Sequence, residues 1–128
     1  MAKIVRSNTT LALLILMFVC LNSGETQVIA AGKTWCVAKP SASRRELLDN
    51  IAYSCDHVNC ALIQAGGACF EPQSFINHAS VAMNLYYQRS GRNPWNCNFT
   101  NSGLIVLTDP SYDDCNYEFY LPKATTDQ

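Results

Sequence analysis

The sequence is poor in the residues that nucleic-acid-binding proteins and most enzymes concentrate. Only 15% of its 128 residues are charged, the net charge is −1, and no basic cluster is present to pair with phosphates. The histidines, His57 and His78, are expected at the surface or in helix packing. Asp113 and Asp114 are adjacent in a turn, so their carboxylates should not face each other across a cleft, as glycoside hydrolysis requires. We therefore expect no nucleic-acid partner, no metal or cofactor, and no catalysis.

The sequence also lacks an apolar run long enough to span a bilayer, which takes roughly 20 residues. The run Leu11–Leu21 has 11 residues, follows a basic segment and precedes a stretch that ends in small residues. That order is typical of a secretory signal peptide, so we assign 1–31 to a leader that is cleaved somewhere within 23–31. The tail, 121–128, is polar, whereas a glycolipid-anchor signal would need a hydrophobic end. We expect 32–120 to form one module, secreted without a membrane anchor.

Cysteine is the exception to this sparse composition. Of seven cysteines, Cys20 lies in the leader, and the module keeps Cys36, Cys55, Cys60, Cys69, Cys97 and Cys115. An even number in a short secreted chain is typical of a disulfide framework. Zinc binding is the alternative, but it favours closely spaced pairs, and only Cys55 and Cys60 come near that spacing. The spacing leaves open all fifteen ways of pairing six cysteines.

Apolar periodicity and capping residues predict two helices. Ser43 and Glu46 form a capping box, and apolar residues then recur at helical spacing, which indicates a first helix over about 44–56. A second helix should start at Pro72, because proline suits the first helical position, and Gly91 should cap its end.

The second helix is expected to have one buried side. Its inner face would carry Phe75, Ala79, Ala82, Met83 and Tyr86. The opposite side would carry Asn77, Ser80, Asn84, Tyr87 and Gln88. Two β-prone runs, 34–38 and 104–108, predict the strands, and 56–70 should be loop. The fold class is therefore a small, disulfide-rich α+β domain with two helices and a minimal sheet.

Aromatic, amide and charged side chains gather where the second helix ends. Within nine residues the chain places Tyr87, Gln88, Arg89 and Trp95. Sugars present apolar C–H faces, which aromatic rings cover, and hydroxyl groups, which amide and charged side chains can bond. The stretch is a candidate carbohydrate surface, although most aromatic rings in so small a domain should be core. Tyr86 should be buried and Tyr87 exposed, while both possibilities stay open for Trp95.

An N-glycosylation sequon follows the fifth cysteine of the module. It is Asn98-Phe99-Thr100, and it predicts a glycan on Asn98 at an accessible surface. A second sequon, Asn8-Thr9-Thr10, lies in the leader and is set aside.

Several segments, taken in order, resemble a known plant family. They are "TWCVAKPSAS" at 34–43, "CALIQAGGACFEP" at 60–72, "INHASVAMNLYYQRSGR" at 76–92, "CNF" at 97–99 and "LTDPSYDDC" at 107–115. With the cysteine spacing, they are similar to the plant carbohydrate-binding module of family 43. The resemblance implies two helices packed at an angle on a small antiparallel sheet, and binding of β-1,3-glucan (callose) in plant cell walls. Because the chain has no catalytic barrel or anchor tail, it resembles the stand-alone secreted members, which include small pollen allergens.

The resemblance also implies a disulfide pairing and a binding mode. The pairing would be Cys36–Cys97, Cys55–Cys115 and Cys60–Cys69. In the binding mode, glucose rings stack on exposed aromatics while amides and charged groups hold hydroxyls. The expected contacts are Tyr87, Gln88, Arg89, Trp95, Asn84 and Tyr112.

The predicted function is non-catalytic binding of β-1,3-glucan by a monomer in the apoplast or cell wall. The alternative is a secreted inhibitor or signalling ligand on the same disulfide scaffold, which would bind a protein through an exposed loop or hydrophobic patch.

Overall fold

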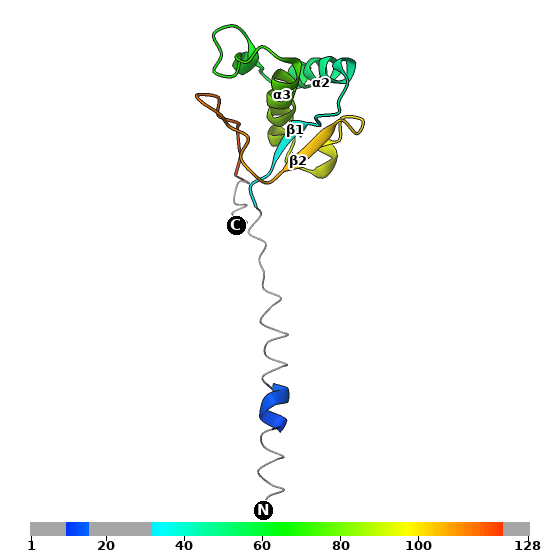
Figure 1. The fold of residues 1–128 in the computed structure, drawn as a ribbon, viewed down its shortest axis with the longest axis vertical. Coiled ribbons are helices and arrows are strands. Elements are labelled where there is room, and N and C mark those ends of the chain that lie inside the picture. Colours follow the sequence, from blue (N-terminus) through cyan, green and yellow to red (C-terminus); the bar gives the residue numbers. More distant parts are fainter. Residues whose placement is uncertain (1–9, 16–31, 122–128) are drawn as a thin grey trace, which may run out of the picture. The chain divides into compact units, whose positions relative to one another are not determined.

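The computed structural model describes residues 10–15 and 32–121. The chain divides into two units, Met1–Gly32 and Lys33–Gln128. In the first unit, residues 10–15 form a short helix, blue in Figure 1. The rest of the predicted leader, including its cleavage region, lies outside the described residues. Among the described helices, none is long and apolar enough to cross a membrane.

The second unit combines helices with a two-stranded sheet. In chain order its elements are β1 (Trp35–Ala38), α2 (Arg44–His57), η1 (Ala61–Ile63), α3 (Phe75–Arg89), η2 (Pro94–Cys97) and β2 (Gly103–Val106). The strands pair antiparallel, with Trp35 opposite Val106 and Ala38 opposite Gly103. α3 packs against both α2 and β1 (Figure 1). The predicted α+β fold is confirmed.

α2 begins where its capping residues predict. The Oγ atom of Ser43 accepts from the Glu46 backbone N–H at 3.2 Å, and the Glu46 Oε2 atom accepts from the Ser43 N–H at 2.7 Å. Two N–H groups at the helix start, which have no intrahelical partner, are thereby satisfied. The observed helix, Arg44–His57, ends one residue beyond the predicted limit.

α3 begins later than predicted. Its N-cap is Ser74, whose Oγ atom accepts from the Asn77 backbone N–H at 3.2 Å, so Pro72 lies in the preceding turn. A serine cap supplies an acceptor that proline cannot, and it fixes the helix start. At the other end Gly91 has a φ of 103°. This left-handed conformation favours glycine and closes the helix as predicted.

The disulfides differ in part from the implied pairing. They are Cys36–Cys97, Cys55–Cys60 and Cys69–Cys115. The first is confirmed, but the expected Cys55–Cys115 and Cys60–Cys69 bridges are wrong. α2 ends just after Cys55 and the chain reverses, which brings the Cα atom of Cys60 within 5.5 Å. Cys69 instead lies beside the C-terminal loop, where its Cα atom is 4.7 Å from that of Cys115.

α3 is buried on more sides than its sequence pattern predicts. Ala79, Ala82 and Met83 are fully buried, as expected of the inner face. Phe75, however, is 40% exposed, and Tyr86 is only half-buried. The prediction of one buried side fails because α2 covers one side of α3 and β1 covers another.

Ser80, Asn84 and Gln88, here called the polar stripe, occupy the side of α3 that faces β1. The β1 backbone donates to this stripe, from Cys36 N to Asn84 Oδ1 at 3.1 Å and from Ala38 N to Ser80 Oγ at 3.0 Å. Gln88 Nε2 donates to the Thr34 carbonyl at 2.9 Å, just before the strand. Since the residues recur every four positions, they form one row on the helix. The row accepts hydrogen bonds from backbone N–H groups of β1 that a second neighbouring strand would otherwise accept.

Candidate functional site

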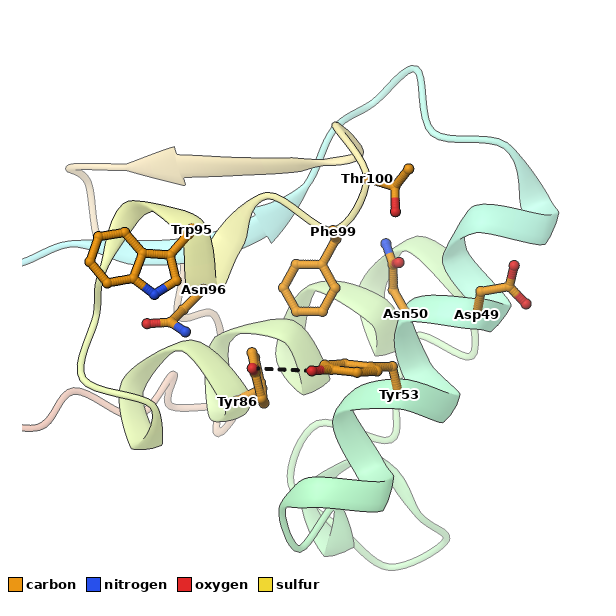
Figure 2. Close-up of a pocket in the computed structure, with 8 residues that line it drawn as sticks. All are labelled: Asp49, Asn50, Tyr53, Tyr86, Trp95, Asn96, Phe99 and Thr100. Carbon is orange, nitrogen blue, oxygen red and sulfur yellow. Dashed lines mark hydrogen bonds between the residues drawn. The ribbon is translucent and has the colours of Figure 1, made fainter.

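A cleft of about 420 Å³ lies between α2, α3, η2 and the segment that follows η2. We call it the aromatic cleft; it is lined by Asp49, Asn50, Tyr53, Tyr86, Trp95, Asn96, Phe99 and Thr100. Figure 2 shows these side chains, with Trp95 at one edge and the rings of Tyr53, Tyr86 and Phe99 close together. Its volume lies within the range of roughly 300–1,000 Å³ that is usual for ligand pockets.

Three aromatic rings form the interior of the cleft. The ring centroids of Tyr53 and Tyr86 are 5.2 Å apart, and those of Tyr86 and Phe99 are 5.7 Å apart. The planes meet at 73° and 74°, so edges rest on faces. The His57 ring packs against Tyr53, with centroids 4.4 Å apart and planes tilted by 36°, and its Nδ1–H donates to the Tyr53 carbonyl at 2.7 Å. The rings therefore hold one another in place around an open space.

Trp95 stands at the edge of the cleft and is its most exposed ring. It is 72% exposed, on the short η2 helix that Pro94 begins. The asparagines of η2 fix the turn, since Asn96 Oδ1 accepts from the Asn93 backbone N–H at 3.1 Å. The exposed indole is held by a turn that hydrogen bonds fix, and its apolar face can stack on the C–H face of a sugar.

The two tyrosine hydroxyls in the cleft share a hydrogen bond. Their oxygens lie 3.3 Å apart, drawn as a dashed line in Figure 2. This bond raises the pKa of Tyr53 and lowers that of Tyr86, and either hydroxyl can be its donor. Further bonds from Ser90 and Asn96 also lower the pKa of Tyr86. Whichever hydroxyl donates, the other keeps its own hydrogen for a ligand hydroxyl.

The polar rim of the cleft comes from α2. Asn50 is 6% exposed, and its Nδ2 donates to Ser102 Oγ at 2.8 Å, which holds the amide in one orientation. Asp49 is exposed, and it is the only acidic residue that lines the cleft within the part of the chain that the structure describes. A single carboxylate can accept hydroxyl hydrogens, but it cannot supply the acid and base pair of glycoside hydrolysis.

Three of the residues expected to touch glucan are structural. Asn84, Tyr87 and Gln88 are 1%, 2% and 3% exposed. The Tyr87 hydroxyl bonds to Thr34 Oγ1 at 2.8 Å, and Asn84 Nδ2 donates to the Glu118 carbonyl at 2.9 Å. The expectation that Tyr87 is exposed is wrong, because β1 and the C-terminal segment cover that side of α3.

Tyr112 and Arg89 lie apart from the aromatic cleft. The Tyr112 hydroxyl donates to the Glu71 carbonyl at 2.7 Å and accepts from Asn77 Nδ2 at 2.8 Å, so it ties two loops together. Arg89 is exposed and pairs with Glu118 at 3.8 Å, beside the loop that contains Gly66 and Gly67. Of the six expected residues, only Trp95 lines the cleft.

The sequence reading missed Tyr53, Phe99 and Asn50. Tyr53 and Asn50 lie three residues apart on α2, so they share one side of the helix, and that spacing was a usable signal. Phe99 had no such signal. It has a φ of 45° in a loop, and its position depends on the turn between η2 and β2.

Comparison with known proteins places the chain in a family. The X8 domain family matches residues 34–104. The chain is 51% identical over 89 residues to a glucan endo-1,3-beta-D-glucosidase of Olea europaea, a match covering 69% of this chain and 19% of that protein. It is 45% identical over 87 residues to the major pollen allergen Ole e 10 of the same species, covering 66% of this chain and 71% of the allergen. A glucan endo-1,3-beta-glucosidase of Triticum aestivum is 47% identical over 88 residues, again over 19% of its length.

The chain belongs to the X8 domain family, also known as carbohydrate-binding module family 43, which confirms the resemblance drawn from its motifs. It spans about a fifth of the two glucosidases, at 19%, but most of the pollen allergen, at 71%. The similarity to the glucosidases is therefore to a small part of proteins that are much longer.

Proposed function

We propose that this protein binds β-1,3-glucan in the aromatic cleft, without hydrolysing it. The observation that carries the proposal is the cleft itself, where the exposed indole of Trp95 stands near the hydroxyl-bearing pair Tyr53 and Tyr86. Glucose rings stack on the indole and on the tyrosine rings, and Tyr86, Asn96 and Asp49 bond their hydroxyls. The names of the glucosidase relatives support the choice of a 1,3-linked β-glucan.

The binding is non-catalytic. Among residues 10–15 and 32–121, Asp49 is the only acid at the cleft, whereas glycosidases use two carboxyl groups that face each other across the bond to be broken. The family match also covers a module that forms only a fifth of the glucosidases, and the shorter relative Ole e 10 consists mostly of this module.

The protein acts outside the cell, as a monomer in the plant cell wall. Three disulfides in a domain this small favour an oxidising compartment, where such bridges persist. The apolar run near the N-terminus, typical of a signal peptide, supports the same location.

Titration calorimetry with laminarin, a soluble β-1,3-glucan, tests the cleft. We expect Trp95→Ala combined with Tyr86→Ala to weaken binding at least about tenfold, or about 1.4 kcal/mol, because both stacking surfaces are lost. Far-ultraviolet circular dichroism and disulfide content should match those of the wild type, since neither side chain belongs to the buried core.

Two matched variants test whether position matters. Tyr120→Ala removes an aromatic ring that is 39% exposed but lies outside the cleft, and Arg89→Ala removes an exposed charge beside it. Both should bind laminarin as the wild type does. The aromatic cleft would not be the glucan site if the folded Trp95→Ala/Tyr86→Ala variant bound laminarin with unchanged affinity. An equal loss of affinity in Tyr120→Ala would contradict it as well. Release of reducing sugar above a heat-killed control would contradict the non-catalytic part.

A further inference from the structure

The sequon Asn98-Phe99-Thr100 adopts an unusual backbone in the loop between η2 and β2. Three successive residues have left-handed φ angles, of 45° for Phe99, 52° for Thr100 and 66° for Asn101. Asparagine tolerates this region, but a β-branched threonine strongly disfavours it. Local conformation therefore does not explain why threonine occupies position 100. A requirement for its hydroxyl in an N-glycosylation sequon does explain it.

The side chain of Asn98 is held in an orientation suited to a glycan. It is exposed, and its Oδ1 atom accepts from the Asn101 backbone N–H at 3.1 Å. The carbonyl oxygen is thereby bonded to the loop, while the amide nitrogen, the attachment atom of an N-linked glycan, belongs to an exposed side chain. Among residues 32–128, Asn98-Phe99-Thr100 is the only such sequon.

Asn98 also lines a groove separate from the interior of the cleft. The sequon groove has a volume of about 580 Å³ and is lined by Lys39, Pro94, Trp95, Cys97, Asn98, Gly103, Leu104 and Ile105. Trp95 and Leu104 are 72% and 42% exposed there. Gly103 allows the close approach of β2 to η2, because a Cβ atom at this position would lie 1.8 Å from the Cys97 carbonyl oxygen. The groove therefore offers the apolar surface of Trp95 and Leu104 beside the exposed Asn98 side chain.

We propose that an N-linked glycan on Asn98 covers the sequon groove, with its first N-acetylglucosamine resting on the indole of Trp95. Asn98 follows Trp95 by one turn, and its backbone N–H donates to the Trp95 carbonyl at 3.5 Å, so the attachment point adjoins the ring. Lys39, whose Nζ donates to Asn101 Oδ1 at 2.7 Å, provides a polar group at the same edge. A sugar fits this combination of an aromatic face and a polar rim.

The glycan forms by group transfer in the secretory pathway. The amide nitrogen of Asn98 bonds to the anomeric carbon of an oligosaccharide carried on a lipid diphosphate and loses one proton. The bond between that carbon and the diphosphate oxygen breaks, and the lipid diphosphate leaves. No oxidant or reductant takes part.

The glycan gives Trp95 two different neighbours. One lies in the sequon groove and is covalently attached, and the other, bound in the aromatic cleft, is the glucan proposed above. The glycan would contact Trp95 from the sequon groove and so limit the motion of the indole at the edge of the aromatic cleft. This inference rests on the proposed secretion but not on glucan binding.

The test uses the full chain, secreted from a eukaryotic host that makes high-mannose glycans. Mass spectrometry should find the glycan on Asn98 in the wild type and in Thr100→Ser, which preserves the sequon, but not in Thr100→Ala. Endoglycosidase H then leaves a single N-acetylglucosamine on the folded protein. Peptide N-glycosidase F removes the whole glycan and converts Asn98 to aspartate.

Acrylamide quenching of tryptophan fluorescence reports the contact. The protein has two tryptophans, and Trp35 is only 4% exposed, so the quenching response comes from Trp95. Because a sugar would cover one of the two faces of the indole, complete deglycosylation should raise the quenching constant about twofold. The form with one N-acetylglucosamine should keep most of the protection, and Trp95→Phe should lose the response.

Two controls keep the outcomes separable. An Asn98→Asp chain reproduces the sequence left by complete deglycosylation, so its quenching should match that of the treated wild type. A chain that is not secreted, or is secreted without a glycan on Asn98, overturns the proposal, and so does equal quenching of all three glycoforms. Laminarin binding is measured separately on the deglycosylated protein, so failure of the groove and failure of the glucan site give different results.

Discussion

Tyr86 and Tyr87 are neighbours on α3, yet they lie in environments of opposite kinds. Tyr86 lines the aromatic cleft, where its hydroxyl meets that of Tyr53. Tyr87 is 2% exposed, and its hydroxyl is bonded to Thr34 on the side that faces β1. The comparison shows that the side of α3 rich in polar side chains can be the buried one. Polar atoms are buried there because the backbone of β1 and the C-terminal segment bond to them.

The largest expected effect on unfolding free energy comes from removing the disulfide that links the polar-stripe side of α3 to the side of the aromatic cleft. Cys36–Cys97 ties β1, which pairs with the polar stripe, to η2, which carries Trp95. Removing it as Cys36→Ala/Cys97→Ala opens a loop of 61 residues and should cost about 4 kcal/mol of unfolding free energy. Removing the Cys55–Cys60 bridge, with a separation of 5, should cost about 2 kcal/mol. Urea unfolding of both variants measures the difference.

The same variants check the pairing by thiol counting. Cys55→Ala/Cys60→Ala should show no free thiol under denaturing conditions, because the two remaining bridges are intact. Two free thiols would instead support the pairing Cys55–Cys115 and Cys60–Cys69.

A second prediction concerns the loss of stability when a buried hydrogen-bonding residue of α3 is removed. Asn84→Ala deprives the Cys36 N–H and the Glu118 carbonyl of their partner in the interior. Since each unpaired buried group costs about 1–3 kcal/mol, we expect a loss of about 3 kcal/mol in unfolding free energy. Thermal unfolding should shift down by at least about 10 °C for a domain of this size.

Asn116 provides the matched control, because it is an exposed asparagine in the C-terminal loop. Asn116→Ala should leave the free energy of unfolding within about 0.5 kcal/mol of the wild type. A similar loss of unfolding free energy in Asn84→Ala and Asn116→Ala would show that the buried hydrogen bonds of the polar stripe do not add to stability.

A third prediction separates the adjacent tyrosines by removing one hydroxyl at a time. Tyr87→Phe loses the bond to Thr34 and should reduce unfolding free energy by about 1 kcal/mol, with laminarin affinity unchanged. Tyr86→Phe should do the reverse, weakening laminarin binding several-fold while stability stays within about 0.5 kcal/mol. Calorimetry and urea unfolding are run on both. The comparison fails if Tyr87→Phe is the variant that loses glucan.

The smallest expected effect is on how the free energy of unfolding changes at alkaline pH, and it involves Tyr117, which lies beside the polar stripe of α3. Burial raises the pKa of Tyr117, which also bonds to Ser80 of the polar stripe. An unfolded tyrosine ionises near pH 10, whereas folded Tyr117 keeps its proton, so stability present below about pH 10 is lost as pH rises further. Tyr117→Phe should flatten that decline by at most about 1 kcal/mol per pH unit. Urea unfolding between about pH 9 and 11 measures the slope, and parallel slopes would contradict the assignment.

Local sequence signals predicted most of the fold. The Ser43–Glu46 capping box located α2, and Gly91 located the end of α3, because both act through bonds or backbone angles within a few residues. The β-prone runs located both strands to within two residues. The family motifs added the antiparallel pairing of those strands, which local signals could not give.

The candidate site was much less predictable. Spacing on a single helix suggested that Tyr87 and Gln88 were exposed, but β1, contributed from the start of the module, covers them. Nor could the sequence pair Tyr53 with Tyr86, since they lie on different helices, or place Phe99 from a loop against both rings. Trp95 was the one candidate retained, because a short helix begun by proline presents it to solvent.

The sequence by itself determined the type of protein: a disulfide-linked α+β module of a carbohydrate-binding family, with helix limits set by local capping. The tertiary structure alone decided which cysteines meet and which face of α3 is open. Both depend on how distant segments approach one another, and the spacing of residues along one element does not contain that information. The polar stripe and Tyr86 of the aromatic cleft are on the same helix, and the positions of β1 and α2 distinguish their environments.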